Sequence, residues 1–178
     1  MGNITPAQMF DHELNPIKGW WDMHALDKRV QIGTNPVTVQ RGMVGYIHPT
    51  TVDFILGVVN GYMPLFTFPG EKDFDANSDV GNISGGWLNT LVATGGYELE
   101  TTEFVAGGTY DPQTSLTGAT GADIGKLRPT THGWCGHAMI VGVVSEPGPR
   151  TNDHGKDVIR FWPVFCPNRQ CDENRGMS

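Results

Sequence analysis

The segment that starts at Tyr62 and ends at Phe104, YMPLFTFPGEKDFDANSDVGNISGGWLNTLVATGGYELETTEF, is the most informative part of the chain. It holds a compact apolar run, a polar loop rich in Asp, Asn and Gly, and an acidic segment interrupted by threonines. This order predicts strand, loop, strand, turn and strand, because β-branched and aromatic residues favour strands and Gly, Asn and Asp favour turns. The segment has no nucleophile beside a base and no glycine pattern suited to a phosphate. It therefore indicates a surface for contact.

The composition of the whole chain favours one domain with many turns and few long helices. Its 178 residues are enough for a single domain with a sizeable core. Charged residues make up only 17% of the chain, whereas it contains 24 Gly and 12 Pro. Apolar residues reach 38%, a share that argues against a disordered chain.

The net charge of -7 restricts the class of partner. A non-specific nucleic-acid binder needs a basic face that displaces counterions, and an anionic membrane would repel an acidic protein. The opening residues MGNITPAQMF lack the cationic start and apolar core of a signal peptide. The chain also has no apolar run of the roughly 20 residues that cross a bilayer. We expect a soluble protein that is made inside a cell and binds other proteins, not nucleic acid or a membrane.

Three cysteines, Cys135, Cys166 and Cys171, cannot all be paired within one chain. Reduced thiols are the default in a cytosol. A bridge between Cys166 and Cys171 across the short CPNRQC loop stays open from the sequence, and it would constrain little.

The predicted organisation is an N-terminal arm over residues 1–36, a β domain over 37–167 and a C-terminal tail over 168–178. A short helix is expected to begin at Thr5, which has Pro6 after it and Gln8 in the capping-box position. Aromatic and apolar side chains in the irregular part of the arm must be buried against something. Either they pack on their own domain or they lie on a neighbouring subunit or capsid as anchors. These side chains are Trp20, Trp21 and Met23.

Short apolar runs separated by Gly-rich turns fill the β domain. They predict an all-β sandwich or barrel-like domain, with few short helices, because no long helices alternate with the strands. The expected strands cover residues 37–40, 43–47, 51–59, 64–68, 87–93, 97–104, 138–145 and 158–165.

Two clusters raise the question of a metal site. Alternating oxygen side chains from Asp73 to Asp79 resemble the start of a calcium loop, but Ser78 and Ser84 stand where an EF-hand needs Gly and Glu. An EF-hand is therefore rejected, whereas an incidental cation site and an Asx-rich turn both remain open. The segment THGWCGH at 131–137 could begin a zinc site completed by the two C-terminal cysteines. We favour burial of Trp134 and Cys135 in the core, and we predict no metal and no cofactor.

Two patterns invite a catalytic interpretation. Cys135 could act as a nucleophile beside His132 or His137, but no local signature supplies an orienting group. Glu98 and Glu100 would share one face of a strand about 7 Å apart, the spacing that a carboxylate pair needs. The same pattern is common and inert on a solvated strand face. We expect that the chain is not an enzyme.

Short motifs in a fixed order run through residues 37–167 and resemble the capsid decoration (cement) proteins of tailed bacteriophages. The family pattern is matched by MPLF at 63–66, DFD at 73–75, LVATGGYELETTEF at 91–104, YDP at 110–112, LT at 116–117, GKL at 125–127, IVGVV at 140–144 and IRFWPV at 159–164. The resemblance does not extend to the two ends of the chain.

This resemblance implies a structural virion protein. Such proteins sit on the outer capsid surface between capsomers, often as trimers, and they reinforce the expanded shell against the pressure of the packaged DNA. The expected partners are the major capsid protein and two further copies of the chain. The expected location is the virion, after synthesis in the host cytoplasm. Phe66 and Trp87 are expected in the core.

One alternative from another class remains. A β-sandwich module that binds carbohydrate or a host on the virion surface would also be acidic, Gly-rich and aromatic. An exposed Trp134 or Trp87 beside Asp and Asn would favour this interpretation.

Overall fold

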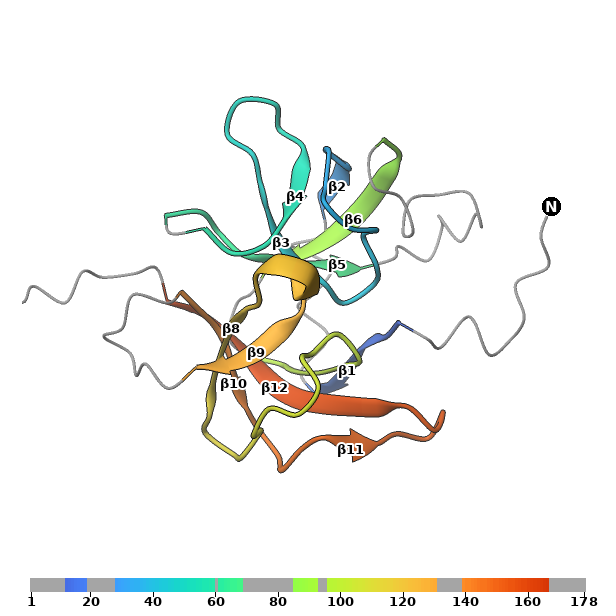
Figure 1. The fold of residues 1–178 in the computed structure, drawn as a ribbon, viewed down its shortest axis with the longest axis vertical. Coiled ribbons are helices and arrows are strands. Elements are labelled where there is room, and N and C mark those ends of the chain that lie inside the picture. The colour runs from blue at the N-terminus through green and yellow to red at the C-terminus, as the bar shows by residue number, and fades with distance from the viewer. Residues whose placement is uncertain are drawn as a thin grey trace, which may run out of the picture.

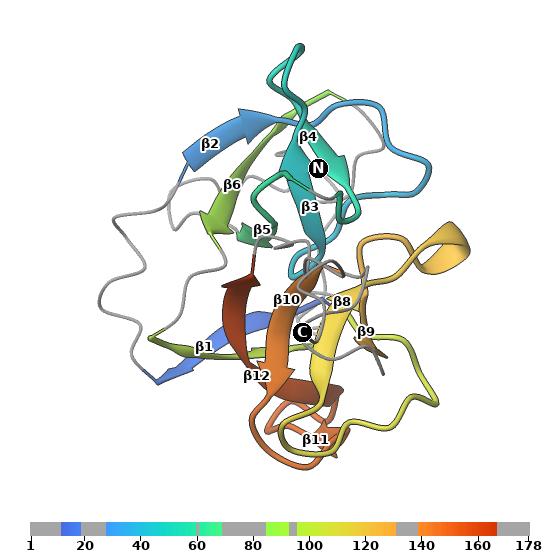
Figure 2. The same cartoon turned by 90° about the vertical axis from the view of Figure 1, so that its left-hand side faces the viewer.

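The computed structural model describes residues 12–18, 28–59, 61–68, 85–92, 96–130 and 139–166. These residues form two antiparallel sheets, so the prediction of an all-β fold is confirmed. Helix is limited, in the described residues, to one 3-10 turn, η2 (Gly121–Asp123). Figures 1 and 2 show one sheet in the upper half of the molecule and the other in the lower half.

The lower sheet has seven strands. In spatial order these are β1 (Leu14–Lys18), β7 (Glu98–Thr101), β12 (Asp157–Cys166), β10 (Ile140–Val144), β8 (Ser115–Gly118) and β9 (Leu127–Thr130), and β11 (Arg150–Thr151) pairs with β12. The upper sheet has the order β2 (Lys28–Gln31), β6 (Trp87–Val92), β5 (Leu65–Phe68), β3 (Val44–Ile47) and β4 (Phe54–Leu56).

Each sheet bends until strands near its two ends come together. In the upper sheet Ile32, directly after β2, bridges Phe54 of β4 in parallel. In the lower sheet Phe104, shortly after β7, bridges Leu127 of β9 in parallel. Backbone hydrogen bonds accompany both bridges, such as the one from Leu127 N to Glu103 O at 2.9 Å. This closure pairs backbone groups that an open sheet would leave at an edge.

Two hydrophobic clusters follow from this curvature. One is lined mainly by the lower sheet and includes Leu99, Leu116 and Phe161, with Val44 and Phe66 reaching it from the upper sheet. The rings of Phe66 and Phe161 lie 5.4 Å apart and join the two sheets. The second cluster is formed by the upper sheet and the segments that flank its strands, and Ile124 from the connection between β8 and β9 packs against it. Its buried members are Val30, Ile32, Val39, Met43, Phe54, Leu56, Leu65 and Leu88.

Two strands of the sheets come from the region predicted as an arm. β1 pairs with β7, and β2 pairs with β6 through the whole of its length. Pro16 lies in β1 opposite Leu99. Proline is tolerated there because β1 is a terminal strand, so the missing N–H costs no ladder bond. Residues 14–18 and 28–31 are therefore part of the β domain, not of an arm that precedes it.

Candidate functional site

Most of the residues singled out from the sequence lie outside the described part of the chain. Phe66 is an exception: it is fully buried in the core, as predicted. Trp87 starts β6, and Cys166 ends β12, but their side chains are not among those described. Outside the described residues altogether are Trp20, Trp21, Met23, Asp73, Asp75, Asp79, His132, Trp134, Cys135, His137 and Cys171.

The most unusual feature of the described structure is a set of four buried glutamates near β1 and β7. Glu13, Glu98, Glu100 and Glu103 are only 1–4% exposed. The sequence suggested that Glu98 and Glu100 lie on a solvated strand face, and this was wrong. A buried carboxylate is costly unless it is paired or hydrogen-bonded, so the partners of these four groups define the site.

Glu13 fastens β1 to the hairpin between β11 and β12. Its Oε2 accepts hydrogen bonds from the side-chain amides of Asn15 at 2.9 Å and Asn152 at 2.6 Å. Its Oε1 lies 2.7 Å from Nδ1 of His154, at the tip of the same hairpin. Burial lowers the pKa of Arg41, and the nearby charge of Glu13 opposes that effect. Residues that are 139 and 141 positions away in the chain thus meet on one carboxylate.

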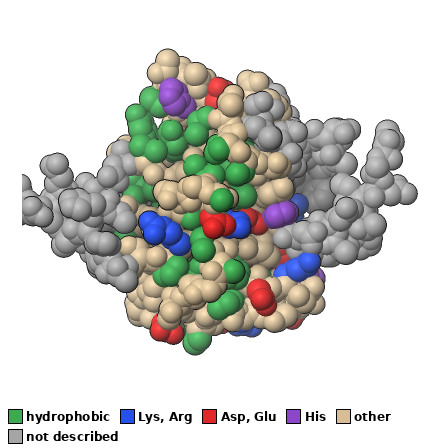
Figure 3. Space-filling model, viewed as in Figure 1, with side chains coloured by type: hydrophobic (Ala, Val, Ile, Leu, Met, Phe, Trp, Pro, Cys, Tyr) green, Lys and Arg blue, Asp and Glu red, His purple; other side chains and the backbone are tan. Residues whose placement is uncertain are grey.

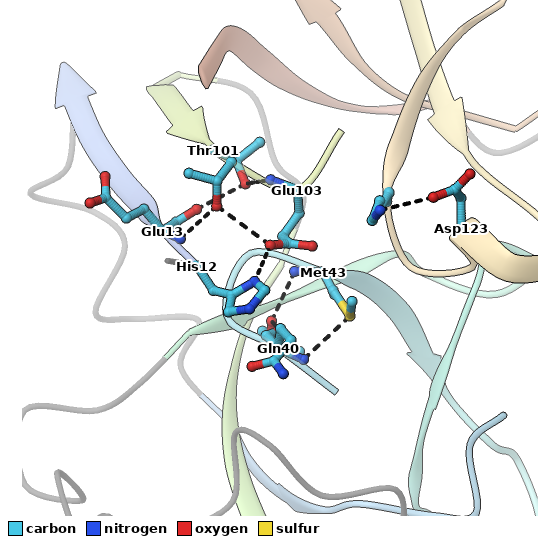
Figure 4. A network of polar contacts seen from close by, with 10 residues as sticks. His12, Glu13, Gln40, Met43, Thr101, Glu103 and Asp123 are labelled. Carbon is cyan, nitrogen blue, oxygen red and sulfur yellow. Dashed lines mark hydrogen bonds and ion pairs between the residues drawn. The ribbon is translucent and has the colours of Figure 1, made fainter. Parts of the chain in front are cut away.

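Glu103 forms a second anchor beside the first (Figure 4). Its Oε1 lies 2.5 Å from Nδ1 of His12, the residue that precedes Glu13. The buried hydroxyl of Thr101 donates to the backbone oxygen of Glu13 at 2.9 Å and accepts from the backbone N–H of Glu103 at 3.0 Å. Gly42 passes so close to this network that an added Cβ would lie 2.6 Å from Thr101 Oγ1. Gly42 also has φ +84°, a left-handed backbone conformation that favours glycine, so a side chain at this position would be strained as well as crowded.

Glu98 and Glu100 do share one face of β7, as predicted. Nε of Arg160 donates to Glu100 Oε2 at 2.9 Å, and the same guanidinium reaches Glu146 at 3.2 Å. Burial alone would lower the pKa of Arg160, but the hydrogen bond and charge of Glu100 raise it. Glu98 is matched less closely, because Nζ of Lys18 lies 3.4 Å from its Oε2 without forming a hydrogen bond to that atom.

Tyr110, on the connection between β7 and β8, is a further buried residue with a polar partner. Its ring is buried against Phe104 in an edge-to-face contact, and its hydroxyl donates to the backbone oxygen of Val105 at 2.7 Å. Burial raises the pKa of Tyr110 to about 12. The phenol is therefore held in its neutral, donating form.

The four carboxylates are held by side chains from other strands and loops, so these contacts join separate segments of the fold. Within the described residues, no group of three or more His, Cys, Asp or Glu side chains is placed to hold a metal ion. The one described helix is far too short to cross a bilayer. Sequence reasoning missed His12, Glu13, Asn152 and His154, because no local spacing connects residues so far apart in the chain.

Comparison with known proteins adds no family assignment: no protein-family model matches the chain, and no curated protein matches it.

Proposed function

We propose that this chain is a structural virion protein, a capsid decoration (cement) protein that binds the outer surface of a phage head between capsomers and stabilises it. The observation that carries the proposal is the order of short motifs that resembles this family. Several of these motifs lie on strands that pair within the two sheets: the ELET of 98–101 forms β7, IVGVV forms β10, and IRFWPV lies within β12. They supply the scaffold of the described fold.

A rigid body suits such a role. Glu13 and Glu103 tie β1 to the β11–β12 hairpin and to the end of β7, and Arg160 ties β12 to β7. These ties oppose the separation of segments that are distant in the chain. A protein that reinforces a shell under internal pressure needs this resistance to deformation.

An exposed apolar patch offers a place for contact. Val59 and Met63 lie on the loop between β4 and β5 with 38% and 47% of their surface exposed. Tyr62 of the same loop stacks on Tyr46 of β3, with ring centroids 5.4 Å apart, and this contact holds the loop against the sheet. On the face in Figure 3, hydrophobic side chains gather above and below a central band of charged and histidine side chains. Exposed apolar patches of this kind mark protein interaction sites.

The proposal includes a homotrimer whose partner is the major capsid protein. Many copies on one shell would multiply contacts that are individually modest. The terminal strands β1 and β9 each contain a proline, Pro16 and Pro129, which discourages the addition of a further strand. Contact through faces and loops is therefore favoured over pairing of sheet edges.

Co-sedimentation with expanded heads tests the proposal. The heads should be assembled without decoration from the major capsid protein encoded in the same genome, at physiological salt. We expect saturable binding at a fixed ratio of protein to capsid, and that ratio reports whether trimers or monomers occupy the sites. Met63→Gln should weaken binding, whereas Val52→Gln, a matched change at an exposed residue on another loop, should not. Protein that stays in the supernatant at every concentration would overturn the proposal, and a glycan-binding screen would then test the carbohydrate alternative.

A further inference from the structure

The outer face of the lower sheet carries an aromatic side chain between acidic and basic ones. Leu99 and Phe161 are opposite each other and point into the core, so their neighbours along β7 and β12 point outward. Arg160 is opposite Glu100, and continuation of the same register puts Trp162 opposite Glu98. Directly opposed side chains on one face of an antiparallel pair are close enough to interact. Trp162 is 41% exposed.

This face also holds the two buried side-chain atoms that lack a hydrogen bond in the described structure, Glu98 Oε2 and Ser145 Oγ. The backbone N–H of Ser145 donates to Arg160 O at 3.0 Å, which continues the β10–β12 ladder and places Ser145 on the far side of Arg160 from β7. Buried polar atoms without partners are uncommon in folded proteins, and each calls for an explanation. Of the two, Glu98 is opposite Trp162 by the continued register, whereas Ser145 is opposite Arg160.

The charges on this face are unevenly matched. Glu100 and Glu146 share the guanidinium of Arg160, and Glu146 also holds Arg150 at 2.6 Å. Glu98 is paired with Lys18, whose side chain is 74% exposed and makes no hydrogen bond to Oε2. Only the Glu98 end of this pair is buried. Because the Lys18 side chain lies mostly in solvent and leaves Oε2 without a hydrogen bond, a cation that donates to Oε2 can take its place.

We propose that Glu98 and Trp162 form a binding site for a basic side chain, an arginine or lysine, of a protein partner. The guanidinium or ammonium lies over the indole of Trp162 and donates to Glu98 Oε2 in place of Lys18. A tryptophan face attracts such a cation, and a carboxylate gives it a charge-assisted hydrogen bond. The net charge of -7 adds long-range attraction for a basic partner. The site is independent of the capsid-decoration proposal, because any protein with a suitably presented basic residue fits it.

Titration of the full chain with N-acetyl-arginine amide, followed through the indole N–H resonance of Trp162, tests this site. Trp162→Phe assigns that resonance among the five tryptophans of the chain. We expect a saturable shift with the arginine compound and a much smaller one with N-acetyl-citrulline amide, its neutral isostere. Equal shifts with both compounds, or no shift with either, would overturn the proposal.

Two variants separate this site from general attraction to an acidic protein. Glu98→Gln should weaken binding about tenfold, since it removes the charge that strengthens the hydrogen bond, while Glu146→Gln serves as a control of equal net charge and should have little effect. Lys18→Met, at an exposed position, should tighten binding about two- to fivefold, because the competing ammonium is gone. A structural role for Lys18 predicts no such gain, so unchanged or weaker binding by Lys18→Met would contradict the proposal even if Glu98→Gln does not fold.

Discussion

Gly42 provides the sharpest test of the network around Glu13 and Glu103. It has φ +84°, and an added Cβ would lie 2.6 Å from Thr101 Oγ1 and 2.8 Å from the backbone oxygen of Glu13. Gly42→Ala therefore introduces two separate costs. One is the positive φ, about 1–3 kcal/mol for a residue other than glycine. The other is overlap with atoms held by their own hydrogen bonds, about 1–3 kcal/mol.

Gly107→Ala separates these two costs. Gly107 has a similar φ of +78°, but an added Cβ would meet nothing within 4 Å. Both substitutions carry the conformational cost and lower the entropy of the unfolded chain equally. We therefore expect Gly42→Ala to be less stable than Gly107→Ala by about 1–3 kcal/mol, the overlap term alone. For a chain of this length, this corresponds to a difference of about 2–12 °C in the midpoint of thermal unfolding.

Urea unfolding of the two variants and the parent, followed by circular dichroism, measures this difference. Equal free energies of unfolding for Gly42→Ala and Gly107→Ala would refute the reasoning, because they would mean that the network yields to an extra methyl group. A change in the m-value of Gly42→Ala alone would show a different failure, namely a native state that has loosened.

Three further results are expected. Glu13→Ala should lower the free energy of unfolding by about 2–4 kcal/mol, because it removes a buried carboxylate that holds Asn152 and His154; hydrogen exchange should speed up first at the hairpin tip, and unchanged exchange there would count against the anchor. Phe66→Ala should cost about 3–5 kcal/mol by urea unfolding, since it empties the contact between the two sheets; a cost below 1 kcal/mol would place Phe66 outside the core. Burial raises the pKa of Tyr110 to about 12, above the unfolded value near 10. The neutral phenol therefore contributes up to about 3 kcal/mol to the free energy of unfolding below pH 10, and this contribution is lost as the pH rises to 12. Tyr110→Phe should remove this part of the decline in stability at alkaline pH, and an identical decline in both proteins would contradict the assignment.

Much of the β architecture could be predicted from local sequence. Runs such as LFTF at 65–68 and IVGVV at 140–144 combine β-branched and aromatic residues with flanking turns, and both form strands. β2 was missed because the buried Val30, and Ile32 directly after the strand, alternate with Arg29 and Gln31 in a short, polar-looking run. β8 and β9 were missed for a related reason, because Pro129 and the glycines around them resemble turns. Pro129 is tolerated because it lies in β9, the terminal strand of the lower sheet.

The buried carboxylates could not be predicted, for a physical reason. Whether Glu98 and Glu100 face solvent depends on what covers the outer face of β7, and no periodicity in the strand itself records this. Glu13 becomes an anchor only because the β11–β12 hairpin folds back onto β1. The acidic, threonine-rich composition of 98–103 did indicate an unusual segment, but it suggested a solvated surface instead of an internal network.

Scanning calorimetry of expanded heads with and without the bound protein tests most directly our proposal that the chain strengthens a capsid. If the protein is a cement, saturating amounts should raise the temperature at which the shell disrupts, and the increase should follow occupancy. An unchanged transition at full occupancy would contradict the account, because the protein would then bind the head without reinforcing it.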